Sequence, residues 1–284
     1  MSQINLPITP QLNSASLVDT HCHINIMIKK DFDIKLPVNY LELSRDIIQA
    51  AQAHHVTKIL NVGTSLIESQ NCVVLARDFP SCYAAVGIHP NDLTADWRQD
   101  LKQLETLVKQ KELNKIVAIG ECGIDKHYPD FDLHRQRDGF KAQIELALEY
   151  NLALSIHSRD AYDETLRALE EYRAEPNLRG VLHCFSEDQA FADLVISWGF
   201  VLGIGGTLTY PKNQALRLIA QTIDLKNIVL ETDAPFLPPQ IIRGQQNSPK
   251  YIYDICAYLA DLRQVNFELV AQQTTANVTR IFGF

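Results

Sequence analysis

Short apolar runs rich in β-branched residues alternate along this chain with longer stretches in which apolar residues recur every three or four positions. The short runs are typical of buried parallel strands, and the longer stretches of amphipathic helices. Strands are predicted at Leu17–His23, Lys58–Val62, Tyr83–Ile88, Ile116–Gly120, Ala153–His157, Gly180–Phe185, Phe200–Ile204 and Ile228–Glu231. Helices are predicted at Ser44–His54, Ile67–Phe79, Gln99–Glu112, His134–Tyr150, Tyr162–Tyr172, Asp188–Trp198, Asn213–Thr222, Tyr251–Arg263 and Phe267–Arg280.

Eight strands, each followed by a helix, predict an α/β fold, a (β/α)8 TIM barrel formed as one domain over residues 1–284. A doubly wound sheet is the alternative, but the glycine-rich turn that such folds carry after the first strand is missing. Met1–Ser16 is expected to be a short polar leader. The connection Asn25–Leu43 is long for a strand-to-helix loop, so it forms either a wall or lid at the active end or a solvated insertion.

Composition narrows the class of protein. Hydrophobic residues make up 46% of the 284 residues, but no run of 18 apolar residues occurs, so no membrane span is expected. The six scattered cysteines and the lack of a secretory signal favour a cytoplasmic protein with reduced thiols. The net charge of −8 counts against non-specific binding along nucleic acid, although it allows an enzyme that grips one phosphate through metal ions.

Polar residues gather where the predicted strands end. In a barrel these carboxyl ends meet at one mouth, where the chemistry is done. His21 and His23 lie on one face of the first strand, about 7 Å apart along the backbone. The other candidates at strand ends are Glu121, His157, His183 and Asp233, with His89 beyond the third strand. Each alone could be an ordinary buried polar group, but together they predict a site for two divalent ions, Mg²⁺, Mn²⁺ or Zn²⁺, sharing a carboxylate.

The remaining histidines and several cysteines are expected to be structural. His54, His55, His127 and His134 lie at helix ends or in loops, where solvated or capping roles are expected. Cys22, Cys122 and Cys184 each follow a proposed metal ligand directly, and strand alternation turns them toward the layer between barrel and helices. We predict that these three are small buried hydrophobes rather than nucleophiles.

Seven motifs together resemble the TatD family of metal-dependent deoxyribonucleases, within the amidohydrolase-like superfamily. They are Asp19-Thr-His-Cys-His23, Val86-Gly-Ile-His-Pro90, Ile119-Gly-Glu-Cys-Gly-Ile-Asp125, His157-Ser-Arg-Asp-Ala161, His183-Cys-Phe-Ser186, Glu231-Thr-Asp-Ala-Pro-Phe-Leu-Pro238 and Arg243-Gly-Gln-Gln-Asn-Ser-Pro249. The resemblance runs from about Leu17 to the C-terminus. It is more specific for the family than for the substrate.

The resemblance implies roles for individual residues. His21, His23 and Asp233 would hold one metal, Glu121 would bridge to a second, and His157 and His183 would complete the second site. His89 would lie near the substrate phosphate or an additional loosely held metal. Asn91, Arg159 and Arg243 would contact phosphate or support the site, with a structural ion pair as the alternative for Arg243. Two departures from the family pattern are the long Asn25–Leu43 connection and Glu187, which adds negative charge near the mouth.

The resemblance also implies an activity, a 3′-to-5′ exonuclease acting on single-stranded DNA or strand ends. Metal-activated water would cleave the phosphodiester, with Asp233 holding metal and accepting the water proton. The same chemistry could serve a carbonyl hydrolase, such as an aminoacyl-tRNA deacylase or a small-molecule amidase or esterase. A non-catalytic scaffold that kept the barrel is a further alternative. The sequence leaves open the physiological metal, the choice of DNA or RNA, the pathway and the oligomeric state, a monomer included.

Overall fold

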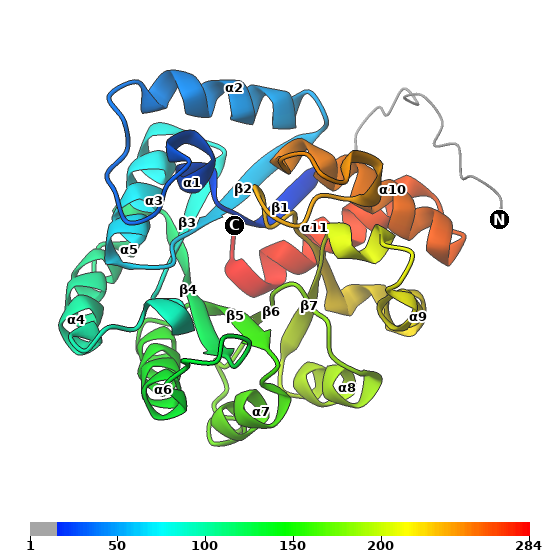
Figure 1. Cartoon of the computed structure of the whole chain (residues 1–284). Helices are drawn as coiled ribbons and strands as arrows, with labels where there is room; N and C mark the ends of the chain where they lie inside the picture. The colour runs from blue at the N-terminus through cyan, green and yellow to red at the C-terminus, as the bar shows by residue number, and fades with distance from the viewer. Residues whose placement is uncertain (1–15) are drawn as a thin grey trace.

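The computed structural model describes residues 16–284, so the predicted leader, apart from Ser16, lies outside the described residues. The strands of this part form one parallel eight-stranded sheet in sequence order, and helices alternate with them (Figure 1). The predicted (β/α)8 barrel is confirmed. The strands are β1 Leu17–Cys22, β2 Val56–Val62, β3 Cys82–Val86, β4 Ile116–Asp125, β5 Ala153–Arg159, β6 Gly180–Leu182, β7 Phe200–Ile204 and β8 Ile228–Leu230.

The barrel closes where the chain segment after β8 runs beside β1. The backbone N–H of Asp233 donates to the carbonyl of His21 at 2.8 Å, and that of His23 donates to the carbonyl of Ala234 at 2.7 Å. Earlier along β1, the Thr20 hydroxyl donates to the Leu230 carbonyl at 3.0 Å. The first and last strands therefore bring their polar ends into register at one place.

Helices surround the barrel in the order predicted, with α11 crossing the ring of strands (Figure 1). They are α1 Ile24–Lys29, α2 Tyr40–Gln52, α3 Leu66–Asp78, α4 Trp97–Val108, α5 Lys111–Asn114, α6 Leu133–Glu149, α7 Tyr162–Glu170, α8 Gln189–Ser197, α9 Gln214–Thr222, α10 Ile252–Arg263 and α11 Phe267–Phe282. No helix among the described residues is both long and apolar enough to cross a membrane.

The structure differs from several of the predicted elements. The short helix α1 lies in what was predicted to be an irregular connection, and the single helix predicted at Gln99–Glu112 is two helices, α4 and α5. Strand β4 runs to Asp125, five residues beyond the predicted end at Gly120. These differences matter at the site, because α1 and the end of β4 both supply residues to it.

Two apolar layers hold the barrel together. One lies between strands and outer helices and includes Cys22 and Cys122, as predicted. The other fills the barrel interior with small and β-branched residues such as Val18 and Val201, against which Val278, Ile281 and Phe282 of α11 pack. Burying each such side chain contributes about 1.5–3 kcal/mol. Because α11 closes the amino-terminal end of the barrel, the open end is the mouth at the carboxyl ends of the strands.

Candidate metal centre

Three imidazoles point their Nε2 atoms at two carboxylates in the barrel mouth. The Nε2 atoms of His21 and His23 are 3.2 Å apart. His21 Nε2 lies 3.4 Å from Glu121 Oε2, and His23 Nε2 lies 3.4 Å from Asp233 Oδ1. His183 Nε2 lies 3.7 Å from Glu121 Oε1 and 3.9 Å from Asp233 Oδ1. Residues from β1, β4 and the segments after β6 and β8 thus converge on one buried volume.

The opposite ring nitrogens of these histidines face fixed partners. Nδ1 of His21 lies 3.1 Å from the Ser155 hydroxyl, and Nδ1 of His23 lies 2.8 Å from the Val62 carbonyl. Nδ1 of His183 lies 3.1 Å from a Glu231 oxygen. The carbonyl partner of His23 keeps the proton on Nδ1 and leaves the Nε2 lone pair toward the centre, as metal-binding histidines require.

His157 is held differently, between two carboxylates. Its Nδ1 lies 2.9 Å from Glu121 Oε1 and its Nε2 lies 3.0 Å from Asp125 Oδ2. Burial opposes protonation, but the Asp125 and Glu121 carboxylates raise the pKa of His157 above its ordinary value. Asp125 was not among the predicted site residues. It ends the quoted β4 motif, and only the extension of β4 shows that it reaches the site.

His89 and Asn91 lie beside the same cluster, on the segment after β3. His89 Nε2 is 3.8 Å from Glu121 Oε1, and its Nδ1 accepts the Asn91 backbone N–H at 3.2 Å. The Asn91 side-chain amide donates to Asp125 Oδ2 at 3.2 Å. Burial, followed by the neighbouring His157, lowers the pKa of His89 to about 3. His89 is therefore a neutral imidazole at the edge of the cluster.

The donor set fits divalent cations. Ligand atoms of His21, His23 and Glu121 lie close enough to hold one ion, as do those of His89, Glu121 and His157. A third set joins His21, His183 and Asp233. Imidazole nitrogens and carboxylate oxygens suit Zn²⁺, Mn²⁺ or Mg²⁺. Because Glu121 belongs to two of these sets, the geometry is compatible with the predicted sharing of one carboxylate between two ions.

Both central carboxylates are held in their charged form. Burial would raise the pKa of Glu121, but hydrogen bonds from His157 and His21 hold it well below its ordinary range. For Asp233, burial is likewise outweighed by the hydrogen bond from His23 and the nearby His183, which lower its pKa. Two ionised carboxylates among imidazoles form the electrostatic environment that a divalent cation prefers.

Buried polar groups beneath the centre fix the position of Asp233. The Asp19 carboxyl accepts hydrogen bonds from the hydroxyl of Thr232 at 2.6 Å and from its N–H at 3.0 Å. The Asn247 amide donates to the carbonyls of Thr232 and Phe236, each at 2.7 Å. Burial raises the pKa of Asp19 to about 8. Asp233 itself adopts a positive φ of 57°, a strained conformation that these contacts on either side of it hold in place.

Glu231 supports His183 from below. It is fully buried, and its Oε1 accepts the Cys184 backbone N–H at 2.5 Å. The carboxylate occupies the space above Gly203, where an added Cβ would lie 2.2 Å from Glu231 Oε2. Glu231 begins one of the quoted motifs. Neither Glu231 nor the requirement for a glycine at position 203 was predicted as part of the site. The contact of Glu231 with His183 depends on a fold that brings the segments after β6 and β8 together.

The cluster lies at the base of a cavity of about 470 Å³. His89, Asn91 and Arg159, which were predicted to contact the substrate or support the site, line this cavity, whereas Arg243 does not. Arg243 is exposed and lies over the Tyr210 ring at 4.1 Å, and no ion pair to it is found among residues 16–284. The structural ion pair considered for Arg243 is therefore replaced by a cation–π contact.

Aromatic side chains surround the cavity opening. Phe32, Tyr128 and Phe236 line it with 52%, 56% and 40% of their surfaces exposed, and we call these three the aromatic rim. The rings of Phe32 and Phe236 are nearly parallel, with centroids 6.4 Å apart. The Arg159 guanidinium lies 5.9 Å from the Tyr128 ring. The long connection after β1 therefore forms a wall of the cavity, one of the two outcomes expected for it.

A buried ion pair anchors that wall. Lys29 Nζ lies 2.5 Å from the Glu68 carboxylate, and both side chains are fully buried. Glu68 also accepts the Asp33 backbone N–H at 2.7 Å, and Lys29 donates to the Ile34 carbonyl at 3.0 Å. Phe32 therefore projects from a short segment that is tied down on both sides.

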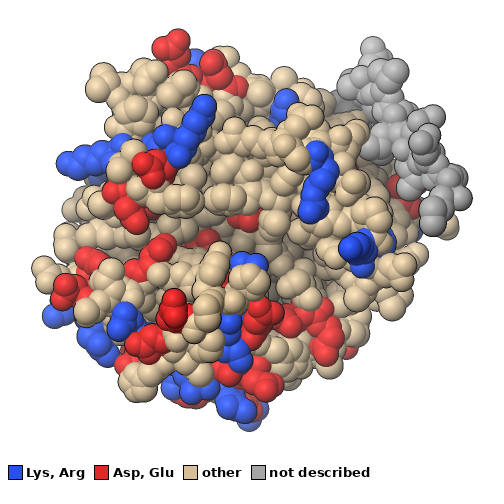
Figure 2. Space-filling view, in the orientation of Figure 1, with Lys and Arg blue, Asp and Glu red and all other residues tan. Residues whose placement is uncertain are grey.

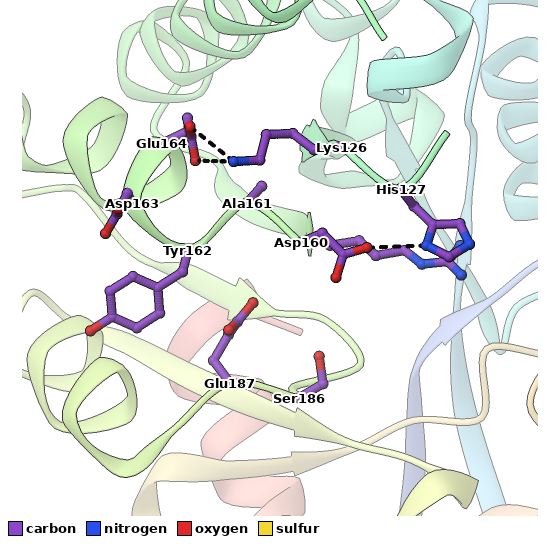
Figure 3. Close-up of a pocket in the computed structure, with 10 residues that line it drawn as sticks. Lys126, His127, Asp160, Ala161, Tyr162, Asp163, Glu164, Ser186 and Glu187 are labelled. Carbon is purple, nitrogen blue, oxygen red and sulfur yellow. Dashed lines mark hydrogen bonds and ion pairs between the residues drawn. The ribbon is translucent and has the colours of Figure 1, made fainter. Parts of the chain in front are cut away.

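Figure 3 shows a second hollow, of about 650 Å³. Arg159 lines both this hollow and the metal cavity. The lining of the second hollow includes Asp160, Asp163, Glu164 and Glu187, with Lys126 paired to Glu164 at 3.0 Å. Glu187 thus adds negative charge to this neighbouring hollow rather than to the metal cavity itself. Carboxylates outnumber cations here, so the hollow is a poor place for phosphate groups.

Charges elsewhere on this face are mixed. Figure 2 shows Lys and Arg side chains that are mostly separate from one another and interspersed with Asp and Glu. A protein that tracks along duplex would present a continuous basic stripe. Among the described residues, the face in Figure 2 carries no such stripe.

The residues predicted to be structural mostly behave so. His54 Nδ1 lies 2.8 Å from the Ala50 carbonyl near the end of α2, and His134 is 89% exposed. His127 lies 3.1 Å from Asp160 in the neighbouring hollow. Cys184 differs from the prediction, because it is only partly buried and has a positive φ of 46°. Burial raises the pKa of its thiol well above the ordinary value, so it remains protonated.

Comparison with known proteins identifies close relatives over nearly the whole chain. A family model described as TatD related DNase matches residues 18–283. An uncharacterized metal-dependent hydrolase of Bacillus subtilis, YabD, is 32% identical over 266 residues, which are 94% of this chain and 98% of that protein. The 3′-5′ ssDNA/RNA exonuclease TatD of Citrobacter rodentium is 31% identical over 261 residues, 89% of this chain and 97% of its own.

A solved structure shows the same likeness in three dimensions. The crystal structure of YjjV, a TatD homologue from Escherichia coli, superposes with a TM-score of 0.85 and 29% identity. That match covers 94% of this chain and 98% of the other. The likeness therefore extends over the barrel and all the strand ends that carry the candidate metal ligands.

Proposed function

The chain belongs to the TatD-related DNase family of metal-dependent hydrolases, and from that premise we propose that it removes nucleotides from the 3′ ends of single-stranded DNA. The observation that carries the proposal is the convergence of four histidines and two carboxylates at the base of one open cavity. One relative is named as a 3′-5′ exonuclease acting on ssDNA and RNA, which supports the polarity and the kind of substrate.

The cavity favours a strand end over a duplex. Its volume of about 470 Å³ is that of a pocket for a small ligand rather than a groove for a double helix. Aromatic side chains at the opening offer surfaces on which unpaired bases can stack. The acidic hollow on one side disfavours phosphates, so a strand would leave over another part of the opening.

His21, His23, Glu121, His157, His183 and Asp233 would hold two divalent ions. When bound, such ions polarise a phosphoryl oxygen, lower the pKa of water and stabilise the leaving oxygen. This is the chemistry that a phosphodiester needs, because its negative charge repels an attacking hydroxide.

The protein's own groups orient the reactants and move the proton. Asp233 is ionised, partly exposed to the cavity and fixed by Thr232 and Asn247, so its carboxylate can accept the proton of the attacking water. Arg159, with its guanidinium at the opening, can bind a phosphate oxygen of the incoming strand. Neutral His89 can donate a hydrogen bond to the same phosphate.

The hydrolysis is proposed to proceed in one displacement, without a covalent enzyme intermediate. Cys184 is the thiol beside the cluster, but it remains protonated and hence a weak nucleophile. Its neighbours Glu231 and His183 are engaged with each other. The attacking group is then water, with Asp233 as the base.

The test is degradation of single-stranded DNA labelled at one end or the other, with Mg²⁺ or Mn²⁺ and again after chelation. The proposal predicts metal-dependent shortening from the 3′ end. Aminoacyl-tRNA and simple carboxylic esters are tested in parallel, because activated water attacks carbonyl centres as well. Hydrolysis of a carbonyl substrate without DNA cleavage, by protein shown to contain metal, would refute the nuclease proposal.

A further inference from the structure

Resting on the proposed function, we propose that Phe32 and Phe236 form a stacking site for a nucleobase of the strand end held at the metal centre. The ligand is a planar base, and the residue that decides its binding is Phe32. Phe32 lies in the long connection after β1 and is not one of the proposed metal ligands, so the site would be separate from the metal chemistry.

The first argument is exposure. Phenylalanine is usually buried, but here 52% of Phe32 and 40% of Phe236 remain exposed at the cavity opening. Two exposed aromatic rings from segments 204 positions apart in the sequence lie together over one cavity. An apolar patch retained at such a place is typical of a ligand-binding surface.

The second argument is ring geometry. The two rings are nearly parallel, with an interplanar angle of 7° and centroids 6.4 Å apart. Direct face-to-face contact would need only about 3.5–4.0 Å between carbon atoms. The pair is therefore not in full face-to-face contact, and part of the ring surface remains for a third planar group oriented the same way.

The third argument is distance to the chemistry. The Phe236 ring is 6.0 Å from the ring of His23, a proposed metal ligand, at an angle of 65°. A base and its own phosphate are separated by one sugar. A phosphodiester at the metal centre would therefore bring a neighbouring base to the level of this aromatic pair.

The fourth argument is preorganisation. The segment that carries Phe32 is tied by the buried Lys29–Glu68 pair and by the hydrogen bond from the Asp33 backbone N–H to Glu68. The Asn71 side chain also donates to the Ile34 carbonyl at 2.8 Å. A ring held in place before binding loses little conformational entropy when a base stacks on it.

The experiment compares two single-stranded oligonucleotides that differ only at the 3′ end. One ends in ordinary nucleotides, the other in abasic sugars, and both carry phosphorothioate linkages there to slow cleavage. Binding is measured by fluorescence anisotropy with metal present, and cleavage of unmodified counterparts is measured separately. Wild-type protein is expected to bind the base-containing end roughly tenfold more tightly than the abasic end.

In the Phe32→Ala variant the base-containing end should bind only as well as the abasic end, with metal content unchanged. Phe32→Trp should keep the preference. The matched control is Phe131→Ala, since Phe131 is a partly exposed aromatic residue that lines a different hollow.

The outcomes separate this inference from the proposed function. If wild-type protein cleaves DNA but binds both ends equally, or if Phe32→Ala keeps the preference, the stacking site is refuted and the nuclease stands. If wild-type protein hydrolyses only non-nucleic substrates, the proposed function fails. Loss of the preference in Phe131→Ala as well would show a general effect and would also overturn the assignment.

Discussion

The base of the cavity and its opening are built on opposite principles. At the base, His21 and Glu121 are nearly or fully buried, and each ligand group has a partner behind it that fixes its orientation. At the opening, the aromatic rim is roughly half exposed, and Phe32 is held only through the buried Lys29–Glu68 pair and the backbone hydrogen bonds of its neighbours. We call the six proposed metal ligands the floor: His21, His23, Glu121, His157, His183 and Asp233.

The difference indicates that the floor and the aromatic rim have separate roles. Hydrolysis requires ligand atoms placed to within fractions of an ångström, which buried and mutually hydrogen-bonded side chains provide. Choice of substrate requires exposed surface of suitable shape, which can change without disturbing the ligands. Under the proposed function, the floor would carry out the hydrolysis and the rim would adjust which strand ends are bound.

The most damaging change to the floor should be Asp233→Asn. The amide keeps the shape but can neither accept the water proton nor contribute charge, so activity should fall roughly 10²- to 10⁴-fold. Asp163→Asn, in the neighbouring acidic hollow, is the control and should retain activity. Activity is measured on labelled single-stranded DNA, with circular dichroism to check folding. Full activity of Asp233→Asn would remove it from the mechanism.

Lys29→Met should weaken the support of the rim without touching the floor. It leaves the Glu68 carboxylate buried and unpaired, which costs about 3–5 kcal/mol of unfolding free energy. Lys141→Met breaks an exposed pair with Glu171, which is worth about 0–1 kcal/mol, and serves as control. Urea denaturation gives the comparison. Equal effects of the two changes would show that the wall is not anchored as described, and Lys29→Met with Glu68→Gln should recover part of the loss.

Asp125→Asn tests the support behind one metal ligand. Losing the carboxylate beside His157 Nε2 should reduce metal affinity or activity about 10- to 100-fold. Asp138→Asn, on the exposed side of α6, should change neither. Metal titration followed by the cleavage assay measures both quantities. If Asp125→Asn behaves as Asp138→Asn does, Asp125 does not support the metal ligand and His157 is oriented by Glu121 alone.

A smaller effect should link pH to metal binding. Burial alone would lower the pKa of His23 and of His157. The neighbouring carboxylates outweigh burial, so Asp233 raises the pKa of His23 and Asp125 raises that of His157. Without metal these imidazoles keep a proton to higher pH, whereas a bound metal needs them neutral. Metal binding near pH 7 should therefore release protons, and the apparent affinity should increase as pH rises through the raised pKa values.

Calorimetric metal titration in two buffers of different ionisation enthalpy measures that release. His134→Gln, an exposed histidine, should leave it unchanged, while Asp125→Asn should reduce it. Heat that does not depend on the buffer would contradict the account.

In the metal-free protein the same raised pKa values stabilise the fold below the ordinary histidine pKa of about 6.5. This contribution to stability is lost as pH rises through the raised pKa values.

The floor was predictable from sequence, because its residues follow directly on apolar strands and parallel strands end together. The structure brings His21, His23, Glu121, His157, His183 and Asp233 to one place, although their binding of metal stays a prediction. The support behind them was harder to foresee. Asp125 and Glu231 were visible in motifs, but their contacts depend on which ring nitrogen of His157 or His183 faces the centre.

The rim was not predictable in detail. Helix α1 has only six residues and is separated from the end of β1 by His23 alone, so the local pattern does not mark where the strand ends and the helix begins. The Lys29–Glu68 pair joins residues 39 positions apart, and nothing local to either residue reveals it. Arg243 shows the same limit, because its contact with Tyr210 follows from tertiary packing.

Counting bound metal tests the division between floor and rim most directly. Wild-type protein, Glu121→Gln and Phe32→Ala are dialysed together against the same divalent metal, and the ions per chain are determined by mass spectrometry. The account predicts two ions in wild type and in Phe32→Ala, and one or none in Glu121→Gln, which loses the shared carboxylate. Equal metal content in wild type and Glu121→Gln, or loss of metal in Phe32→Ala, would contradict it.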